Sequence, residues 1–99
     1  MINLKHLSSL LGNDEALITR FISIFKTQIP QQLLTLRVAL EQQAWEDAAL
    51  AAHDIKSQCR YFELEDVAEW CQKIEDHPLK ESHLYPAVAA RLTAVLAAL

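Results

Sequence analysis

The residues of this chain best suited to chemistry lie in one stretch, AAHDIKSQCRYF at residues 51–62. His53 is followed three residues later by Lys56 and seven residues later by Arg60, so on a helix both cations would lie on the turns that follow the imidazole. An exposed neutral imidazole is a nucleophile, and two neighbouring cations would stabilise an anion placed on its ring nitrogen. The stretch therefore indicates a histidine able to carry a negatively charged group, provided that it is exposed.

Two other kinds of site are possible from these residue types, a metal site and a hydrolytic pair of acids. His53 and Cys59 fall on nearly opposite faces of one helix, and the spacing from Cys59 to Cys71 matches no zinc motif. The acids at 63–66 lie where a helix begins, and the helix dipole ordinarily explains such acids. We therefore expect no metal site, and we expect both cysteines to be small buried hydrophobic residues.

Length and composition limit the remaining function classes. The chain has 99 residues, 52% hydrophobic and 22% charged, which fits a single folded domain over residues 1–99. The net charge is -4 without a dense lysine and arginine block, so no nucleic-acid partner is expected. A single glycine cannot build glycine-rich phosphate loops. The apolar run 87–99 is too short to span a membrane, and the first residues do not resemble a signal peptide. The two cysteines form neither a disulfide framework nor a C-x-x-C pair, so we expect a reducing, cytoplasmic location.

Apolar residues recur at helical spacing along the chain, which predicts an all-α protein. The expected helices run over about 3–10, from 14 to about 40, from about 44 to 62, from 64 to about 75 and from about 83 to 98, with a polar loop at 76–83. Asn13 is expected to cap the second helix, and Pro30 to kink or interrupt it. Short connections favour antiparallel neighbours, so we expect an antiparallel up-and-down four-helix bundle with a short additional N-terminal helix.

The helix that contains His53 has one apolar stripe, formed by Ala44, Ala48, Ala52, Ile55, Cys59 and Phe62. At the helical repeat, His53 lies about 140° from the centre of this stripe, so it is expected to point to solvent. Ala49, Leu50 and Ser57 lie near it and are small or apolar, which would let a partner approach closely. The remaining histidines fall in or near helix ends and loops, and we expect them on the surface: His6, His77 and His83.

The motif AHDIKS at 52–57 resembles the histidine phosphotransfer (HPt) domains of multistep two-component phosphorelays. The likeness extends upstream through LITRFISIFKTQIPQQLLTLRVALEQQAWEDAALAAH, with its phenylalanines, its mid-helix proline and its QAWED approach to the histidine. Downstream it includes Leu64 and Val67, which open the next helix, so the resemblance covers nearly the whole chain.

This resemblance implies both a fold and a function. In that family a histidine on an exposed helix face accepts a phosphoryl group from the aspartyl phosphate of one receiver domain and passes it to the aspartate of another. Carried over, His53 would be the nucleophile and would carry the phosphoryl group on the ring nitrogen farther from the backbone. Lys56 would balance the phosphate charge. Ser57 would leave room for the receiver. The partner-binding surface would also include Ala49, Leu50 and Arg60. The family's fold, an antiparallel helical bundle, agrees with the periodicity.

The same resemblance implies a phosphoryl carrier rather than an independent enzyme. Phosphoryl transfer depends on positioning and charge neutralisation, and the acidic site of the partner can supply the magnesium ion it needs. We therefore expect no cofactor on this chain. The expected partners are receiver domains of response regulators and of hybrid sensor histidine kinases, and we expect a monomer.

The sequence departs from the family pattern near the motif, since glycine is usual where Ser57 and Glu63 stand, and small residues are common where Gln58 and Cys59 stand. We expect Gln58 to narrow the approach for some receivers, and Glu63 to change the turn after the helix or let the helix run on. A helical adaptor that binds a receiver or kinase through the same face without being phosphorylated stays open as an alternative. So does a helical dimerisation module.

Overall fold

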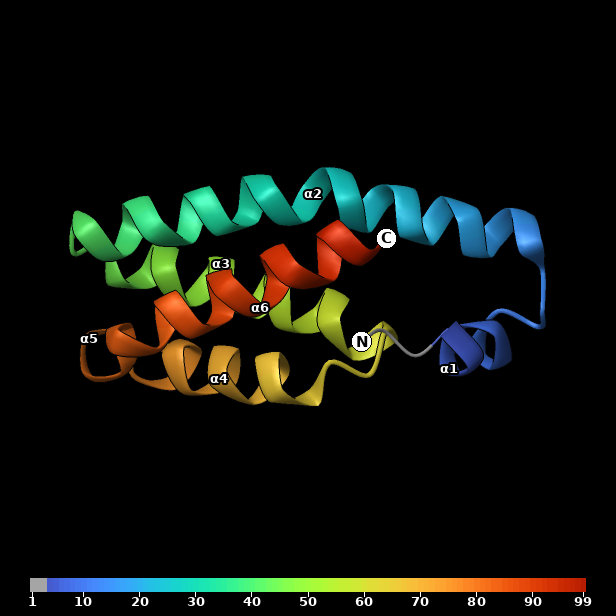
Figure 1. Cartoon of the computed structure of the whole chain (residues 1–99). Helices are drawn as coiled ribbons and strands as arrows, with labels where there is room; N and C mark the ends of the chain where they lie inside the picture. Colours follow the sequence, from blue (N-terminus) through green and yellow to red (C-terminus); the bar gives the residue numbers. More distant parts are fainter. Residues whose placement is uncertain (1–3) are drawn as a thin grey trace.

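The computed structural model describes residues 4–99, which form helices and no strand. A short helix, α1 (Leu4–Leu10), lies at one end of a bundle of four longer helices: α2 (Glu15–Glu41), α3 (Trp45–Tyr61), α4 (Glu65–Asp76) and α6 (Tyr85–Ala98) (Figure 1). Consecutive long helices run in opposite directions, and the molecule measures 41 Å by 20 Å by 20 Å. The predicted all-α, antiparallel up-and-down bundle with a short N-terminal helix is confirmed.

The longest helix, α2, runs along the whole bundle. Its N-cap is Asp14, whose Oδ1 accepts hydrogen bonds from the backbone N–H groups of Ala16 and Leu17 at 3.0 and 3.2 Å. The prediction that Asn13 is the cap was wrong, because Asn13 has a φ of 61° and belongs to the preceding turn. Pro30 lies inside the continuous helix and does not interrupt it. Proline has no backbone N–H, so one carbonyl in the preceding turn lacks its helical donor. Because Pro30 is exposed, water can donate a hydrogen bond to that carbonyl.

A hydrophobic core runs between the four long helices. The predicted stripe of α3 is confirmed, with Ala44 partly buried and its other members fully buried. Small residues in that stripe allow α3 to pack closely against its neighbours, which fixes the helix and leaves its opposite face in solvent. The stripes that meet it contain Phe25, Ile29 and Leu36 of α2, Val67, Cys71 and Ile74 of α4, and Val88, Leu92 and Val95 of α6.

The turns after α2 and α3 each contain a non-glycine residue in the left-handed conformation, Gln43 at a φ of 57° and Glu63 at a φ of 53°. The N–H of Leu64 donates to the carbonyl of Cys59 at 3.0 Å, which closes α3 in the usual manner of a left-handed cap. Glu63 therefore occupies the conformation that glycine favours, at a strain of about 1–2 kcal/mol. Of the two outcomes expected at Glu63, a changed turn or a longer helix, the second does not occur, since α3 ends at Tyr61.

The segment 76–83, predicted to be a polar loop, is largely helical. A single turn, α5 (Pro78–Glu81), and a 3-10 turn, η1 (Ser82–Leu84), join α4 to α6. Pro78 and Pro86 each lie in the first turn of a helix, where backbone amides have no helical partner. The segment is too short and too polar to show a helical repeat in the sequence.

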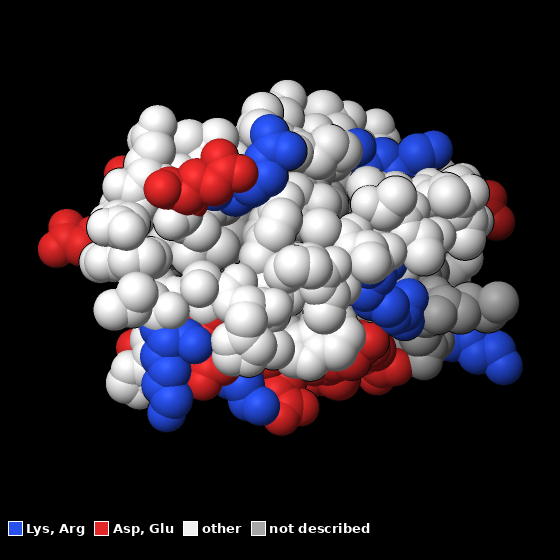
Figure 2. All heavy atoms as spheres, turned by 60° about the vertical axis from the view of Figure 1, so that its left-hand side comes forward, with Lys and Arg blue, Asp and Glu red and all other residues white. Residues whose placement is uncertain are grey.

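The surface mixes charges of both signs. Figure 2 shows one face, on which acidic and basic side chains alternate along the upper and lower edges with a broad uncharged area between them. This face has no continuous basic surface of the kind that nucleic acids require. None of the helices within residues 4–99 is long and apolar enough to cross a membrane.

Candidate functional site

His53 lies midway along α3, on the side of the helix that faces away from the core. Alanine favours the helix, and Glu46 and Asp47 in its first turn and Arg60 in its last turn complement its dipole. The side chain of His53 is 50% exposed. The predicted orientation toward solvent is confirmed, and a partner can reach the ring.

One nitrogen of the His53 ring is already engaged by the neighbouring helix. Nδ1 lies 3.2 Å from Oε1 and 3.3 Å from Oε2 of Glu75 on α4. An ionised carboxylate can only accept hydrogen bonds, so Nδ1 carries the proton and donates it. In the neutral ring, Nε2 then keeps its lone pair. The arrangement makes Nε2 the nucleophilic atom.

Lys56, which the resemblance expects to balance phosphate charge, lies one turn beyond His53 and is buried between α3 and α4. The residue is 7% exposed. Its Nζ donates to Oε1 of Glu75 at 2.7 Å and to Oε1 of Gln72 at 2.8 Å. Gln72 in turn donates from Nε2 to Oδ1 of Asp76 at 2.9 Å. The charge of Lys56 is therefore taken up by Glu75, and Lys56 fixes the carboxylate that holds the imidazole.

The ionisation of Glu75 follows from these contacts. Partial burial acts to raise the pKa of its carboxyl group, but hydrogen bonds from Lys56 and His53 outweigh burial and lower the pKa below its ordinary value. Glu75 is therefore ionised at neutral pH. Positive charge that develops on the imidazole would meet a carboxylate that is already in place.

The other predicted site residues surround His53 at different distances along α3. Leu50 is 62% exposed, Ala49 is half-buried, and Ser57 donates from Oγ to the carbonyl of His53 at 3.0 Å. That hydrogen bond folds the hydroxyl back onto the helix and keeps the surface low. Arg60 is exposed two turns beyond His53, where it lines a shallow pocket with Leu10, Ser57 and Tyr61. That Arg60 assists the imidazole stays a prediction.

Gln58 was expected to narrow the approach for some receivers. Its Nε2 instead donates to Oε1 of Gln28 on α2 at 2.8 Å. Five helical positions separate Gln58 from His53, which places it about 140° around α3. The side chain therefore fastens α3 to α2 on a flank away from the imidazole.

The cysteines have no part in this site. Cys59 and Cys71 are both fully buried, and burial raises the pKa of the Cys71 thiol to about 12 and that of Cys59 well above its usual value. Thiols held protonated in this way are inert as nucleophiles. Within residues 4–99 no group of three histidines, cysteines or acids is placed to hold a metal ion.

Comparison with known families agrees with this geometry. The family model described as the Hpt domain matches residues 20–99. The chain belongs to the Hpt domain family. Searches among curated proteins and among solved structures gave no significant match. The resemblance seen in AHDIKS is thereby confirmed, and this Hpt domain is a histidine-containing phosphotransfer module of a phosphorelay, a class that interacts with receiver domains.

Three histidines lie within the matched part of the Hpt domain, and their settings differ. His77 follows the last residue of α4, and His83 lies in η1 with Nε2 3.8 Å from a carboxylate oxygen of Glu81. Among these three, His53 alone lies within a long helix with a carboxylate and a buried lysine behind its ring.

Glu75 and Gln72 were not among the predicted site residues, although the sequence contains a signal for them. In an antiparallel hairpin, residues equally far from the turn lie opposite each other. His53 and Glu75 are each eleven residues from Leu64, and Lys56 and Gln72 are each eight residues from it. Counting outward from the turn after α3 therefore places Glu75 opposite His53 and Gln72 opposite Lys56.

Proposed function

We propose that His53 is the phosphoryl-carrying residue of this Hpt domain, which accepts a phosphoryl group from the aspartyl phosphate of one receiver domain and passes it to an aspartate of another. The hydrogen bond between Nδ1 and Glu75 carries the proposal, because in the neutral ring it places the proton on Nδ1 and the lone pair on Nε2 of a half-exposed side chain. The domain acts as a carrier rather than an independent enzyme. The proposal places it in the cytoplasm, as a monomer that meets receivers one at a time.

The chemical step follows from the state of the ring. The Nε2 lone pair attacks the phosphorus of the aspartyl phosphate, so the N–P bond forms while the P–O bond breaks and the aspartate leaves as a carboxylate. No proton has to be removed from Nε2. The ring retains its Nδ1 proton and becomes positively charged, which the Glu75 carboxylate stabilises. In the second transfer an acceptor carboxylate attacks the phosphorus, and the neutral imidazole leaves.

Lys56 and Gln72 support this step indirectly, through the contacts that Lys56 makes with Glu75 and with Gln72. Lys56 holds the Glu75 carboxylate through a 2.7 Å contact, and Gln72 accepts a second hydrogen bond from the same ammonium group. Both are positioning residues, because they act on His53 through Glu75. The chain itself brings no metal to the proposed reaction, and the magnesium ion would come from the acidic site of the receiver domain.

The receiver would reach His53 over the low surface of α3. Ala49 and Ser57 lie one turn on either side of the histidine, and neither projects far from the helix. Leu50 and Arg60 extend the proposed contact along the helix, the first as an exposed apolar side chain and the second as a cation. In-line attack requires such close approach.

The experiment is to mix the purified chain with several receiver domains already phosphorylated on aspartate, and to record intact mass and acid lability. The parent and His83→Gln should each gain one acid-labile phosphoryl group, and His53→Gln should gain none. Labelling of His53→Gln would refute the assignment of the site. Tight receiver binding that survives His53→Gln, with no transfer to any variant, would instead establish the adaptor.

A further inference from the structure

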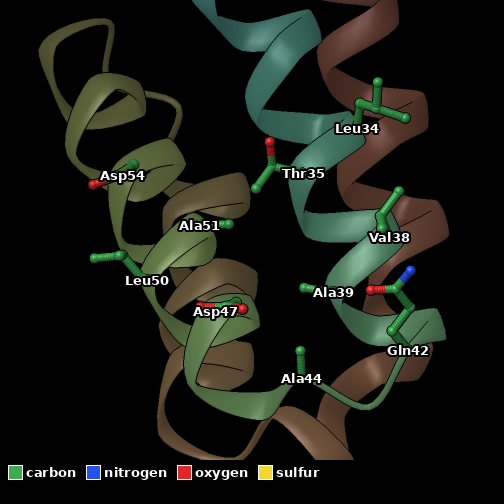
Figure 3. Close-up of a pocket in the computed structure, with 10 residues that line it drawn as sticks. All are labelled: Leu34, Thr35, Val38, Ala39, Gln42, Ala44, Asp47, Leu50, Ala51 and Asp54. Carbon is green, nitrogen blue, oxygen red and sulfur yellow. The ribbon is translucent and has the colours of Figure 1, made fainter.

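A groove between α2 and α3 lies outside the proposed phosphoryl-transfer site, except that the two share Leu50. It encloses about 390 Å³ and lies beside the amino-terminal half of α3 (Figure 3). The lining residues are Leu34, Thr35, Val38, Ala39, Gln42, Ala44, Asp47, Leu50, Ala51 and Asp54. Ala39 and Ala51 point toward each other across the gap, so methyl groups form much of its floor.

Two large apolar side chains that line this groove are exposed to solvent. Leu34 on α2 is 51% exposed and Leu50 on α3 is 62% exposed. In Figure 3 these two leucines lie at the outer edges of the groove, on either side of the alanine floor. Exposed apolar side chains beside a groove are typical of a surface that a partner protein covers. The groove is open and is lined by six apolar and four polar residues, so it suits a protein segment that presents both aliphatic and polar side chains.

The charged residues of the groove indicate the charge of its partner. The lining contains two acids, Asp47 and Asp54, and no lysine or arginine. They are seven residues apart on α3, so they lie about 10 Å from each other along the rim. None of the ion pairs among residues 4–99 includes either carboxylate. The helix dipole accounts for Asp47 in the first turn, but it does not account for Asp54 in the middle of the helix.

We propose that this groove is a docking site for a basic amphipathic segment of a partner protein, which places aliphatic side chains on the alanine floor and lysine or arginine side chains beside Asp47 and Asp54. Such segments bind by burying apolar anchors at helical spacing, and rim charges select the partner. The site needs no phosphoryl group on His53. Leu50 precedes His53 by one turn, so an occupant would also sit next to the face that receivers are proposed to meet.

The probe is a pair of fluorescein-labelled helical peptides with the same leucines at i, i+3, i+4 and i+7, one with lysine and arginine at the other positions and one with glutamate. We expect the basic peptide to bind the chain at least tenfold more tightly by anisotropy. Amide shifts in NMR spectra should concentrate on residues 34–54. Binding should be unchanged in His53→Gln, so this result stands apart from the proposed phosphoryl transfer.

Matched variants locate the site. Asp47→Asn should weaken binding about two- to fivefold, as expected for one exposed ion pair, and Leu34→Gln should weaken it about tenfold. The controls Glu69→Gln and Leu79→Gln change an exposed acid and an exposed leucine elsewhere and should have no effect. The proposal is overturned if neither peptide binds, if both bind equally, or if the groove and control variants behave alike. It is also overturned if light scattering shows that a second copy of the chain fills the groove.

Discussion

Replacing Glu75 by glutamine tests the account of the His53 ring most sharply. The amide oxygen can still accept from Nδ1, so the substitution removes the negative charge while leaving the geometry largely intact. The carboxylate lies 3.2 Å from Nδ1. Coulomb's law at this separation gives about 1 kcal/mol for unit charges in bulk water and about 5 kcal/mol at the effective dielectric of a protein surface.

The lower part of that range applies here. The His53 side chain is half exposed, and the Lys56 ammonium lies 2.7 Å from the same carboxylate oxygen and offsets part of its field. A loss of about 1.4 kcal/mol of transition-state stabilisation corresponds to a tenfold slower reaction. We therefore expect Glu75→Gln to accept phosphoryl groups from a phosphorylated receiver about tenfold more slowly than the parent in rapid-quench experiments.

Two readouts separate this effect from damage to the fold. Glu69→Gln removes an exposed acid from the same helix and should stay within about twofold of the parent rate, as expected for a surface charge. Nitrogen-15 NMR of the imidazole should show the Nδ1–H form in the parent and a mixture of both tautomers in Glu75→Ala. A Glu75→Gln rate equal to that of the parent, or an unchanged tautomer in Glu75→Ala, would refute the reasoning.

Three further predictions concern stability. Glu63→Gly should raise the free energy of unfolding by about 0.5–1 kcal/mol in urea titrations, because glycine adopts the left-handed turn without strain. The gain is smaller than the strain, because glycine gains entropy in the unfolded chain and the substitution removes the exposed contact between Glu63 and His6. A loss of stability would contradict the strained turn. Lys56→Met should lower the free energy of unfolding by about 2 kcal/mol, because it leaves Glu75 without its closest cation. The control Lys73→Met changes a surface lysine and should lower it by less than about 0.5 kcal/mol. Equal losses in the two variants would contradict a stabilising pair between Lys56 and Glu75. Since the pKa of Glu75 is lower in the folded chain, its contribution is present at neutral pH and is lost as the pH falls through that lowered pKa. The stability difference between the parent and Glu75→Gln should therefore shrink in acid, and a difference independent of pH would contradict the ionised pair.

The features of the fold that depend on helical periodicity could be predicted from the sequence. The apolar stripe of α3 located its buried face, and that stripe also placed His53 in solvent. Local details were less predictable. Asn13 and Asp14 are both good capping residues, and the turn geometry alone decides that Asp14 is the cap. The short helical turns between α4 and α6 are set by their neighbours rather than by a repeat of their own.

Only the part of the site that lies on one helix could be predicted from the sequence. His53 and Lys56 share one helix, so their spacing shows that they are neighbours. Glu75 lies on another helix, and its position opposite His53 depends on the register of the α3 and α4 hairpin, which a left-handed Glu63 fixes. The sequence placed the end of this helix near residue 62, but without the expected glycine it left open whether the helix runs on, so the register across the turn was not fixed. The burial of Lys56 could not be predicted for the same reason, because its partners Gln72 and Glu75 both come from α4.

The most direct test of the central claim is to locate the phosphoryl group on the chain by nitrogen-15 and phosphorus-31 NMR after transfer from a phosphorylated receiver. The account predicts a single phosphorus coupled to Nε2 of His53, with the proton retained on Nδ1. A phosphoryl group on Nδ1, or on any histidine other than His53, would contradict it.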